Sequence, residues 1–208
     1  MADTYVCAGT SYQSTNYGTA TSLYVGTSTT SDHSSTYVTF IKFAVPSQTK
    51  TIMNAILQLT VSSLPTYDSN MLIIGNPCGQ TWGETALTWS TATWARNTSQ
   101  STSAAITGVS HNLISLNASM YVAGHVTVAA TANVGDVRRV DITKYIKQCA
   151  GQSATLTIAR RMRNNKYSGN SAGTIPADTL SNGATVGFYS KDASPSSYGP
   201  SIVMLYGK

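Results

Sequence analysis

The stretch Phe40-Ile41-Lys42-Phe43-Ala44-Val45 alternates along its length, with one parity mostly apolar and the other mixed. The same alternation returns in Ile56-Leu57-Gln58-Leu59-Thr60-Val61. Successive side chains of a β-strand point to opposite faces of a sheet, so this period of two predicts strands that place one face on a core. Two such sheets bury their apolar faces by packing against each other.

Short apolar or aromatic runs recur along the chain, separated by Ser, Thr, Gly and Asn. This rhythm is typical of strands and turns rather than of helices. We expect strands at residues 5–6, 22–25, 37–45, 55–61, 71–74, 87–89, 121–128, 154–159, 186–189 and 202–206. The sequence therefore predicts an all-β fold, an antiparallel two-sheet β-sandwich.

One segment has helical periodicity instead. Asp141 is placed to cap a short helix, and Gly151 is placed to end it. Between them, apolar residues follow the i, i+3, i+4, i+7 pattern at Ile142, Tyr145, Ile146 and Cys149. We expect this one short helix to close an end of the sandwich.

Length and composition favour one domain over residues 1–208. Of the 208 residues, 41% are hydrophobic and only 10% are charged, which supplies enough apolar material for a core. No fixed-period repeat or interdomain linker divides the chain, and residues 96–119 and 164–183 are expected to be loops. No run is long and apolar enough for a membrane span, and no secretory signal is recognisable.

A series of short motifs resembles the DNRLRE domain family and runs in that family's order along nearly the whole chain. The motifs include Asp3-Thr4-Tyr5-Val6, Leu23-Tyr24-Val25-Gly26, Phe40-Ile41-Lys42-Phe43, Trp82-Gly83-Glu84-Thr85-Ala86-Leu87-Thr88-Trp89, Asp141-Ile142-Thr143 and Phe188-Tyr189-Ser190-Lys191-Asp192-Ala193. Lys191 and Asp192 depart from the family, where Arg and Glu are usual. The resemblance implies a jelly-roll β-sandwich that acts as a non-catalytic accessory module. Some members bind acidic polysaccharides such as alginate, and others have no assigned ligand.

The Trp82–Trp89 stretch contains the lone glutamate of the chain, Glu84, which has two interpretations. Beside a stacking indole ring, its carboxylate can accept a sugar hydroxyl. As an architectural group, it would pair with Lys42, Arg160 or Lys191 and keep two sheets in register. We favour the architectural role. We expect the same role for the other motif residues, which are Trp82, Trp89, Asp141, Lys191 and Asp192.

Basic residues are concentrated late in the sequence, within a net charge of +5. The basic window consists of Arg138, Arg139, Lys144, Lys147, Arg160, Arg161, Arg163 and Lys166. This basic window raises a positive field that can attract a polyanion, although a solvated face around turns is the alternative interpretation. Exposed aromatic rings near turns can stack on sugars. The predicted glycan- or polyanion-binding residues are Arg160, Arg161, Arg163, Lys166, Trp94 and Tyr167.

Cofactor and catalytic signals are weak in this sequence. The histidines lie far apart and form no metal-binding or hydrolase motif, so we expect a protein that is not an enzyme and needs no cofactor. A structural calcium ion is the one metal to consider, with Asp3, Asp141 and Asp192 as candidate ligands. The three cysteines allow at most one disulfide bridge.

Two functions follow from these observations. The first is a non-catalytic structural or adhesion protein on the surface of a virus particle, as a phage decoration or tail-associated protein, because the chain has its own Met and no export signal. Its partners would be other virion subunits or surface glycans, with self-association into a homo-oligomer as a further option. The alternative is an acidic-polysaccharide-binding module from a secreted, extracellular protein. Neither nucleic acid nor membrane is an expected partner, since no recognition module or membrane span supports one.

Overall fold

The protein was analysed as a computed structural model that describes residues 1–9, 11–27, 36–47, 50–92, 121–160 and 185–207. These ranges contain ten strands, one α-helix and one 3-10 turn. In chain order they are β1 (Ala2–Cys7), β2 (Ser22–Thr27), β3 (Thr36–Ala44), β4 (Ile52–Ser63), β5 (Ser69–Gly75), β6 (Tyr121–Val128), β7 (Val137–Asp141), α1 (Thr143–Gln148), β8 (Ser153–Arg160), β9 (Thr185–Tyr189), η2 (Ser196–Tyr198) and β10 (Ser201–Tyr206).

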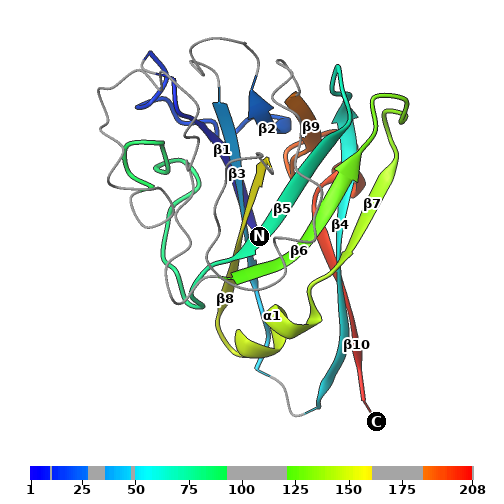
Figure 1. The fold of residues 1–208 in the computed structure, drawn as a ribbon. Coiled ribbons are helices and arrows are strands. Elements are labelled where there is room, and N and C mark those ends of the chain that lie inside the picture. Colours follow the sequence, from blue (N-terminus) through cyan, green and yellow to red (C-terminus); the bar gives the residue numbers. More distant parts are fainter. Residues whose placement is uncertain (10, 28–35, 48–49, 93–120, 161–184, 208) are drawn as a thin grey trace.

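The strands form a curled antiparallel sheet with two layers. The hydrogen-bonded order is β10-β4-β9-β2-β3-β8-β5-β6, with β1 added on β3 and β7 on β4. Strand β4 pairs with β10 and β7 in the smaller layer, and its last residues pair with β9 in the larger one, so hydrogen bonding continues around the curl (Figure 1). The predicted all-β antiparallel fold of the sandwich or jelly-roll class, with one short helix, is confirmed.

The concave side of the sheet holds the larger hydrophobic cluster, here called the inner core. Strand β4 shows the predicted alternation, because Ala55, Leu57 and Leu59 are fully buried while the residues between them are half-buried. The inner core centres on Ile41, Leu57, Leu59, Ile73, Leu156, Ile158 and Phe188. Burial of these side chains from both layers supplies the main hydrophobic stabilisation of the fold.

The opposite face of the larger layer holds a second cluster, the outer core. It consists chiefly of Val38, Phe40, Leu72, Ile74, Trp82, Leu87 and Trp89. Neighbours such as Phe40 and Ile41 therefore enter different cores, since successive strand residues point to opposite faces. Much of β3 and β5 is buried on both faces, whereas the sequence indicated one. The reason is that residues 76–92 cover the outer face, to the left of β3 in Figure 1.

The predictions for individual segments were partly confirmed: the helix was correct, one strand was wrong and one strand was missed. Helix α1 confirms the periodic segment, with Tyr145 and Ile146 buried and Gly151 at a positive φ of 78° just beyond it. The strand expected at 87–89 is wrong, because residues 87–88 connect two turns, at 84–86 and 89–91, and Leu87 and Trp89 pack in the outer core. Strand β7 was not expected at all. Residues 96–119 and 164–183, expected to be loops, lie outside the described ranges. No helix among the described residues has the length and hydrophobicity needed to cross a bilayer.

Candidate functional site

Most of the predicted ligand-binding residues lie outside the part of the chain that the structure describes. These are Trp94, Arg161, Arg163, Lys166 and Tyr167. Arg160 is described and ends β8 opposite Met71, with only 7% of its surface exposed. Arg160 therefore offers little surface to a ligand here, and the role of the basic window stays a prediction.

Trp82 and Trp89 are structural parts of the outer core in this fold. Their exposed fractions are 9% and 6%, so neither presents an open ring face to solvent. The Trp82 indole Nε1 donates a hydrogen bond to Thr155 Oγ1 over 3.2 Å, which fixes the ring against β8. A buried indole needs such an acceptor for its N–H.

Lys42 lies beside Trp82 and defines the edge of a shallow pocket. Its ammonium Nζ donates to the Trp82 carbonyl oxygen and sits 4.7 Å from the centre of the indole ring, within cation–π range. The pocket, about 610 Å³, is lined by Met1, Ala2, Lys42, Ala44, Gln80, Thr81, Trp82, Gly83 and Ser153. We call it the Lys42 pocket.

The lining of the Lys42 pocket combines three kinds of group. Gln80, Thr81 and Ser153 supply amide and hydroxyl groups that both donate and accept hydrogen bonds. The alanines and Met1 supply apolar surface beside the largely buried Trp82 ring, and Lys42 supplies a positive charge with no carboxylate among the lining residues. Sequence reasoning missed this pocket, because its residues come from distant segments and form no local pattern.

Glu84 lies close by and is engaged in structural contacts. Its Oε1 accepts a hydrogen bond from the Asp3 backbone N–H at 2.8 Å, and its Oε2 lies 3.3 Å from Lys191 Nζ. The Glu84 carbonyl accepts from the Asn16 side-chain amide at 2.8 Å. Of the three cations expected as partners for Glu84, the structure therefore places Lys191 on it.

Four charged residues meet around this carboxylate. Asp3 Oδ2 accepts from the Lys191 backbone N–H at 2.8 Å, and Lys191 Nζ lies 2.7 Å from Asp192 Oδ1. One carboxylate oxygen each from Asp3, Glu84 and Asp192 fall within 4.8 Å of one another. This group of Asp3, Glu84, Lys191 and Asp192, the carboxylate corner, joins β1, the Trp82–Trp89 stretch and the residues after β9.

The electrostatics of the carboxylate corner follow from its burial. Removal from water raises the pKa of Asp3 from 3.8 to about 6, and the neighbouring Glu84 carboxylate adds to this, against the stabilising hydrogen bond from Lys191 N–H. The hydrogen bond with Asp192 raises the pKa of Lys191. Asp141, the third predicted calcium ligand, is not part of this group. Its Oδ1 accepts from Thr143 N and Oγ1 at the start of α1, and these bonds lower its pKa.

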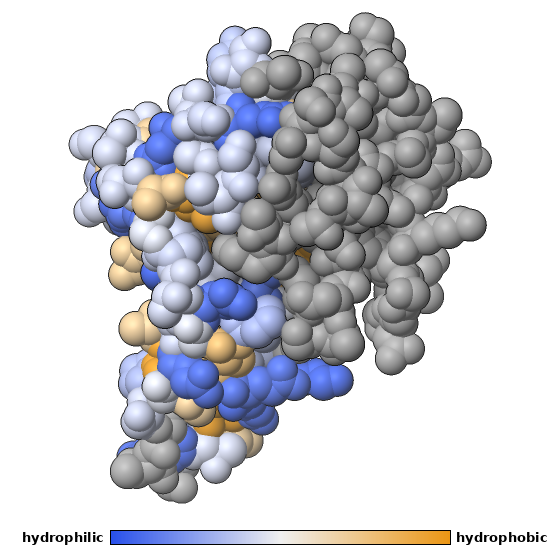
Figure 2. All heavy atoms as spheres, turned by 90° about the vertical axis from the view of Figure 1, so that its left-hand side faces the viewer, coloured by the Kyte–Doolittle hydropathy of each residue, from blue (hydrophilic) through white to orange (hydrophobic). Residues whose placement is uncertain are grey.

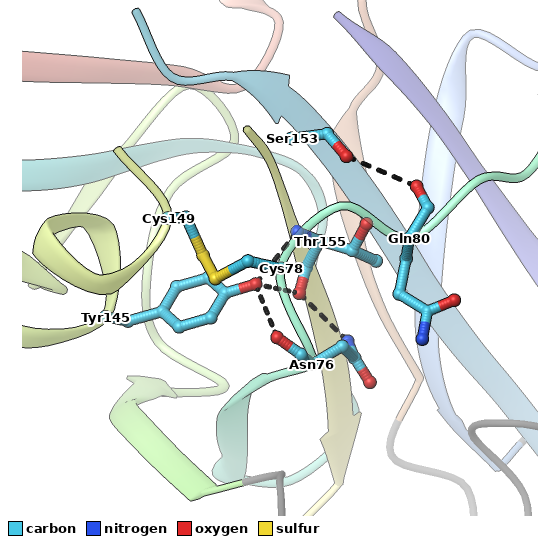
Figure 3. The surroundings of a disulfide bond; sticks show 7 residues. All are labelled: Asn76, Cys78, Gln80, Tyr145, Cys149, Ser153 and Thr155. Atoms are coloured by element: carbon cyan, nitrogen blue, oxygen red, sulfur yellow. Dashed lines mark hydrogen bonds between the residues drawn. A yellow bond between two sulfur atoms is a disulfide. The ribbon is translucent and has the colours of Figure 1, made fainter. Parts of the chain in front are cut away.

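Residues 76–92, which cover the outer core, are here called the covering segment. A second group of contacts holds the start of this segment against α1 and β8 (Figure 3). Cys78 and Cys149 form a disulfide bond, and the third cysteine, Cys7, is buried and is not part of this bridge. The Tyr145 hydroxyl lies 2.9 Å from the Asn76 carbonyl and 2.8 Å from the Thr155 carbonyl, and accepts from the Thr155 N–H at 2.9 Å. We call Asn76, Cys78, Tyr145, Cys149 and Thr155 the helix corner.

Tyrosine rings from β1, β2, β3 and the residues before β2 contact one another. Tyr5 stacks on Tyr17 with ring centres 4.2 Å apart, and Tyr24 and Tyr37 meet Tyr5 edge-on at 5.3 and 5.7 Å. Burial raises the pKa of Tyr5 and of Tyr17, so both phenols are neutral at physiological pH. The rings cover one another more than they face solvent, which favours a structural role.

One face of the described surface is mostly polar, whereas Met53 on β4 and Val203 and Leu205 on β10 are exposed apolar side chains. Figure 2 shows a face that is mostly hydrophilic or intermediate in hydropathy, with apolar atoms only in small separate areas. A second hollow, about 500 Å³, is lined by Ala123, Asp141, Thr143, Lys144 and Lys147 at the start of α1. This hollow offers two ammonium groups, but the Asp141 carboxylate beside them would repel an anionic ligand, and the lining of the Lys42 pocket contains no such group.

The family of the chain follows from a comparison with family models. The model of carbohydrate-binding module family 96 matches residues 1–135, which include β1 to β6 and the Trp82–Trp89 stretch. No curated protein matches the chain. Since the matched residues make up more than half of the sequence, this chain belongs to carbohydrate-binding module family 96.

Proposed function

We propose that this chain is a non-catalytic module that binds an anionic polysaccharide through the Lys42 pocket. Family membership supports carbohydrate binding. The observation that carries the anionic preference is the lining of the pocket, where Lys42 stands among hydroxyl and amide groups without a carboxylate. A sugar acid needs such a set, because its ring carries hydroxyls, an apolar face and a negative charge.

The geometry of Lys42 suits a charge-assisted contact. One of its three ammonium hydrogens is used on the Trp82 carbonyl, and two remain to bind a sugar carboxylate. The indole ring below the ammonium restricts its motion, so less conformational entropy is lost on binding. Thr81 and Gln80 line the same pocket, and their side chains can exchange hydrogen bonds with ring hydroxyls.

The C-terminal third belongs to the same proposed binding domain. Strand β8 pairs with β3 and β5, and β10 pairs with β4, so the strands beyond residue 135 complete the sheet that the earlier strands begin. The resemblance to DNRLRE domains also runs through this region, up to Lys191 and Asp192. We therefore treat residues 1–208 as one domain.

The setting we propose is an extracellular protein, the alternative raised by the sequence. The Cys78–Cys149 disulfide supports it, because disulfides persist in oxidising compartments outside the cytosol. Display on a virus particle is the second candidate, and the small charged fraction of the chain suits packing among neighbouring subunits. Mass spectrometry of purified particles and of the cell-free culture medium distinguishes the two. Recovery with particle proteins would reject the extracellular-module setting.

The binding experiment compares the Lys42→Met variant with wild type on alginate and on a neutral glucan, by isothermal titration calorimetry. We expect wild type to prefer alginate, and the variant to lose roughly tenfold or more in affinity for it, as loss of a charged hydrogen bond does. Lys50→Met, at an exposed lysine that lines neither hollow and lies outside the basic window, is the matched control and should bind as wild type. Unfolding curves of each variant separate lost binding from lost folding.

The predicted basic window is the competing site. An Arg161→Ala/Arg163→Ala variant tests it in the same titration. A large loss in this variant together with normal binding by Lys42→Met would overturn the Lys42 pocket as the contact site. Tighter binding to the neutral glucan than to alginate would reject the anionic ligand.

A further inference from the structure

The carboxylate corner is short of positive charge. It holds three acidic side chains, Asp3, Glu84 and Asp192, against the one ammonium of Lys191. With every group ionised, the corner carries a net charge of −2. Like charges this close repel, and burial weakens the screening that water would give them.

The hydrogen bonds of the corner hold one side of two carboxylates and leave the other side available. Glu84 Oε1 is held by the Asp3 N–H, and Asp3 Oδ2 is held by the Lys191 N–H. What remains is Asp3 Oδ1, together with Glu84 Oε2 and Asp192 Oδ1, which share the Lys191 ammonium. Backbone donors thus fix the direction of the carboxylates before any ligand arrives.

The buried oxygen Asp3 Oδ1 is the observation that points to a cation ligand. Asp3 is 1% exposed, and its Oδ1 is buried with no hydrogen-bond partner within the described part of the chain. A buried carboxylate oxygen without a donor is costly, so native structures normally satisfy it.

We propose that the carboxylate corner binds a calcium ion through Asp3, Glu84 and Asp192. Hard divalent cations bind carboxylate oxygens, and calcium accepts six to eight of them in irregular geometry, with water filling the remaining positions. Magnesium demands near-octahedral order and keeps its own water, so it fits this asymmetric set less well. The charge of the ion matches the net charge of the corner.

Lys191 acts as the counter-ion when calcium is absent. Its side chain is 26% exposed and can turn to solvent, which releases Glu84 and Asp192 to the ion. Calcium then replaces a pair of ion contacts with direct bonds to three segments: β1, the Trp82–Trp89 stretch and the residues after β9. This site shares no ligand residue with the Lys42 pocket, so it does not depend on the proposed glycan binding.

The test uses the full chain, stripped of metal with EDTA and dialysed, and titrated with CaCl₂ and with MgCl₂ by isothermal titration calorimetry. We expect one calcium ion per chain, weaker magnesium binding and a rise in melting temperature with calcium. Tb³⁺ takes the same oxygen ligands, and its emission should be sensitised by Trp82, which lies two residues from Glu84. No calcium heat and no calcium-dependent melting shift in wild type would overturn the proposal.

Two variants and one control locate the site. Asp192→Asn changes an exposed ligand without disturbing the fold, and should weaken calcium binding about tenfold or more. Lys191→Met removes the competing ammonium and should bind calcium at least as tightly as wild type. Asp136→Asn, which breaks the exposed ion pair with Arg138, should leave calcium binding unchanged. Equal weakening by Asp136→Asn and Asp192→Asn would show nonspecific binding and reject the site.

Discussion

The helix corner and the carboxylate corner hold the same covering segment, residues 76–92, by opposite means. The helix corner combines the Cys78–Cys149 disulfide with a neutral network around the Tyr145 hydroxyl, which is 1% exposed. The carboxylate corner uses charged groups, and its Lys191 and Glu84 side chains are 26% and 20% exposed. The helix corner is held by a covalent bond and is buried from solvent. The carboxylate corner is held by ion pairs and is partly exposed to solvent.

This difference means that the two corners respond to different solution conditions. Reductant acts on the helix corner alone, since a buried neutral network is insensitive to ions. Salt acts on the carboxylate corner, because screening reaches partly exposed charges. The outer core under the segment depends on both corners, so its integrity reports on each of them.

The largest expected effect comes from removing the apolar anchor that both corners keep in place. Trp89→Ala should lower the free energy of unfolding by about 4 kcal/mol, because emptying a large aromatic site leaves a cavity. Trp89 is 6% exposed within the outer core. Urea unfolding measures this, with Tyr12→Ala, 48% exposed, as the control. A variant as stable as wild type would show that the segment does not depend on its apolar contacts.

The next effect separates the corners. The Cys78→Ala/Cys149→Ala variant should lose about 3 kcal/mol in free energy of unfolding, since the bridge spans 71 residues of sequence and restricts the unfolded chain. Added reductant should lower the stability of wild type by a similar amount and leave the variant unchanged. If reductant destabilises both proteins equally, the Cys78–Cys149 pairing is not the source of the effect.

A smaller effect tests the ionic character of the carboxylate corner. Glu84→Gln preserves the acceptor for Asp3 N–H but removes the charge facing Lys191, and should cost about 1 kcal/mol or less at low salt. The difference from wild type should shrink in 1 M NaCl. Tyr145→Phe is the comparison in the helix corner, and its cost of about 2 kcal/mol should not depend on salt. A salt-independent Glu84→Gln effect would contradict the ionic assignment.

The smallest effect concerns pH at the start of α1. The Thr143 hydrogen bonds lower the pKa of Asp141 in the folded state, so its ionised form stabilises the fold above the ordinary pKa of 3.8. That contribution is lost as pH falls through the lowered folded-state pKa. Because the side chain is exposed, Asp141→Asn should cost at most about 0.5 kcal/mol at pH 7 and nothing near pH 2. A cost that grows on acidification would have the wrong sign.

Sequence periodicity predicted most of the strands. It did not predict which of their faces other parts of the chain bury. Alternation in Ile56–Val61 identified β4, and the spacing from Ile142 to Cys149 identified α1. The run Leu87–Thr88–Trp89 has the composition of a strand. In the structure it forms no strand, and Leu87 and Trp89 pack in the outer core. Burial alone produces that composition, so the sequence could not distinguish the two.

The candidate sites were likewise predicted only in part from the sequence. Motif reasoning singled out Glu84, Lys191 and Asp192, but it left three possible partners for Glu84 open and grouped Asp141 with the wrong acids. The Lys42 pocket gave no signal at all. Its walls come from β3, the residues after β5 and the start of β8, which become neighbours only through strand pairing.

By itself, the amino-acid sequence determined the period of each segment, because side-chain direction follows from backbone geometry within a few residues. It thereby set the all-β class and the one helix. Only the tertiary structure decided which distant groups meet, such as the Asp3 carboxylate and the Lys191 N–H, which are 188 residues apart. That contact depends on how the sheet curls and which strand pairs with which, and these are collective results of packing that no local stretch encodes.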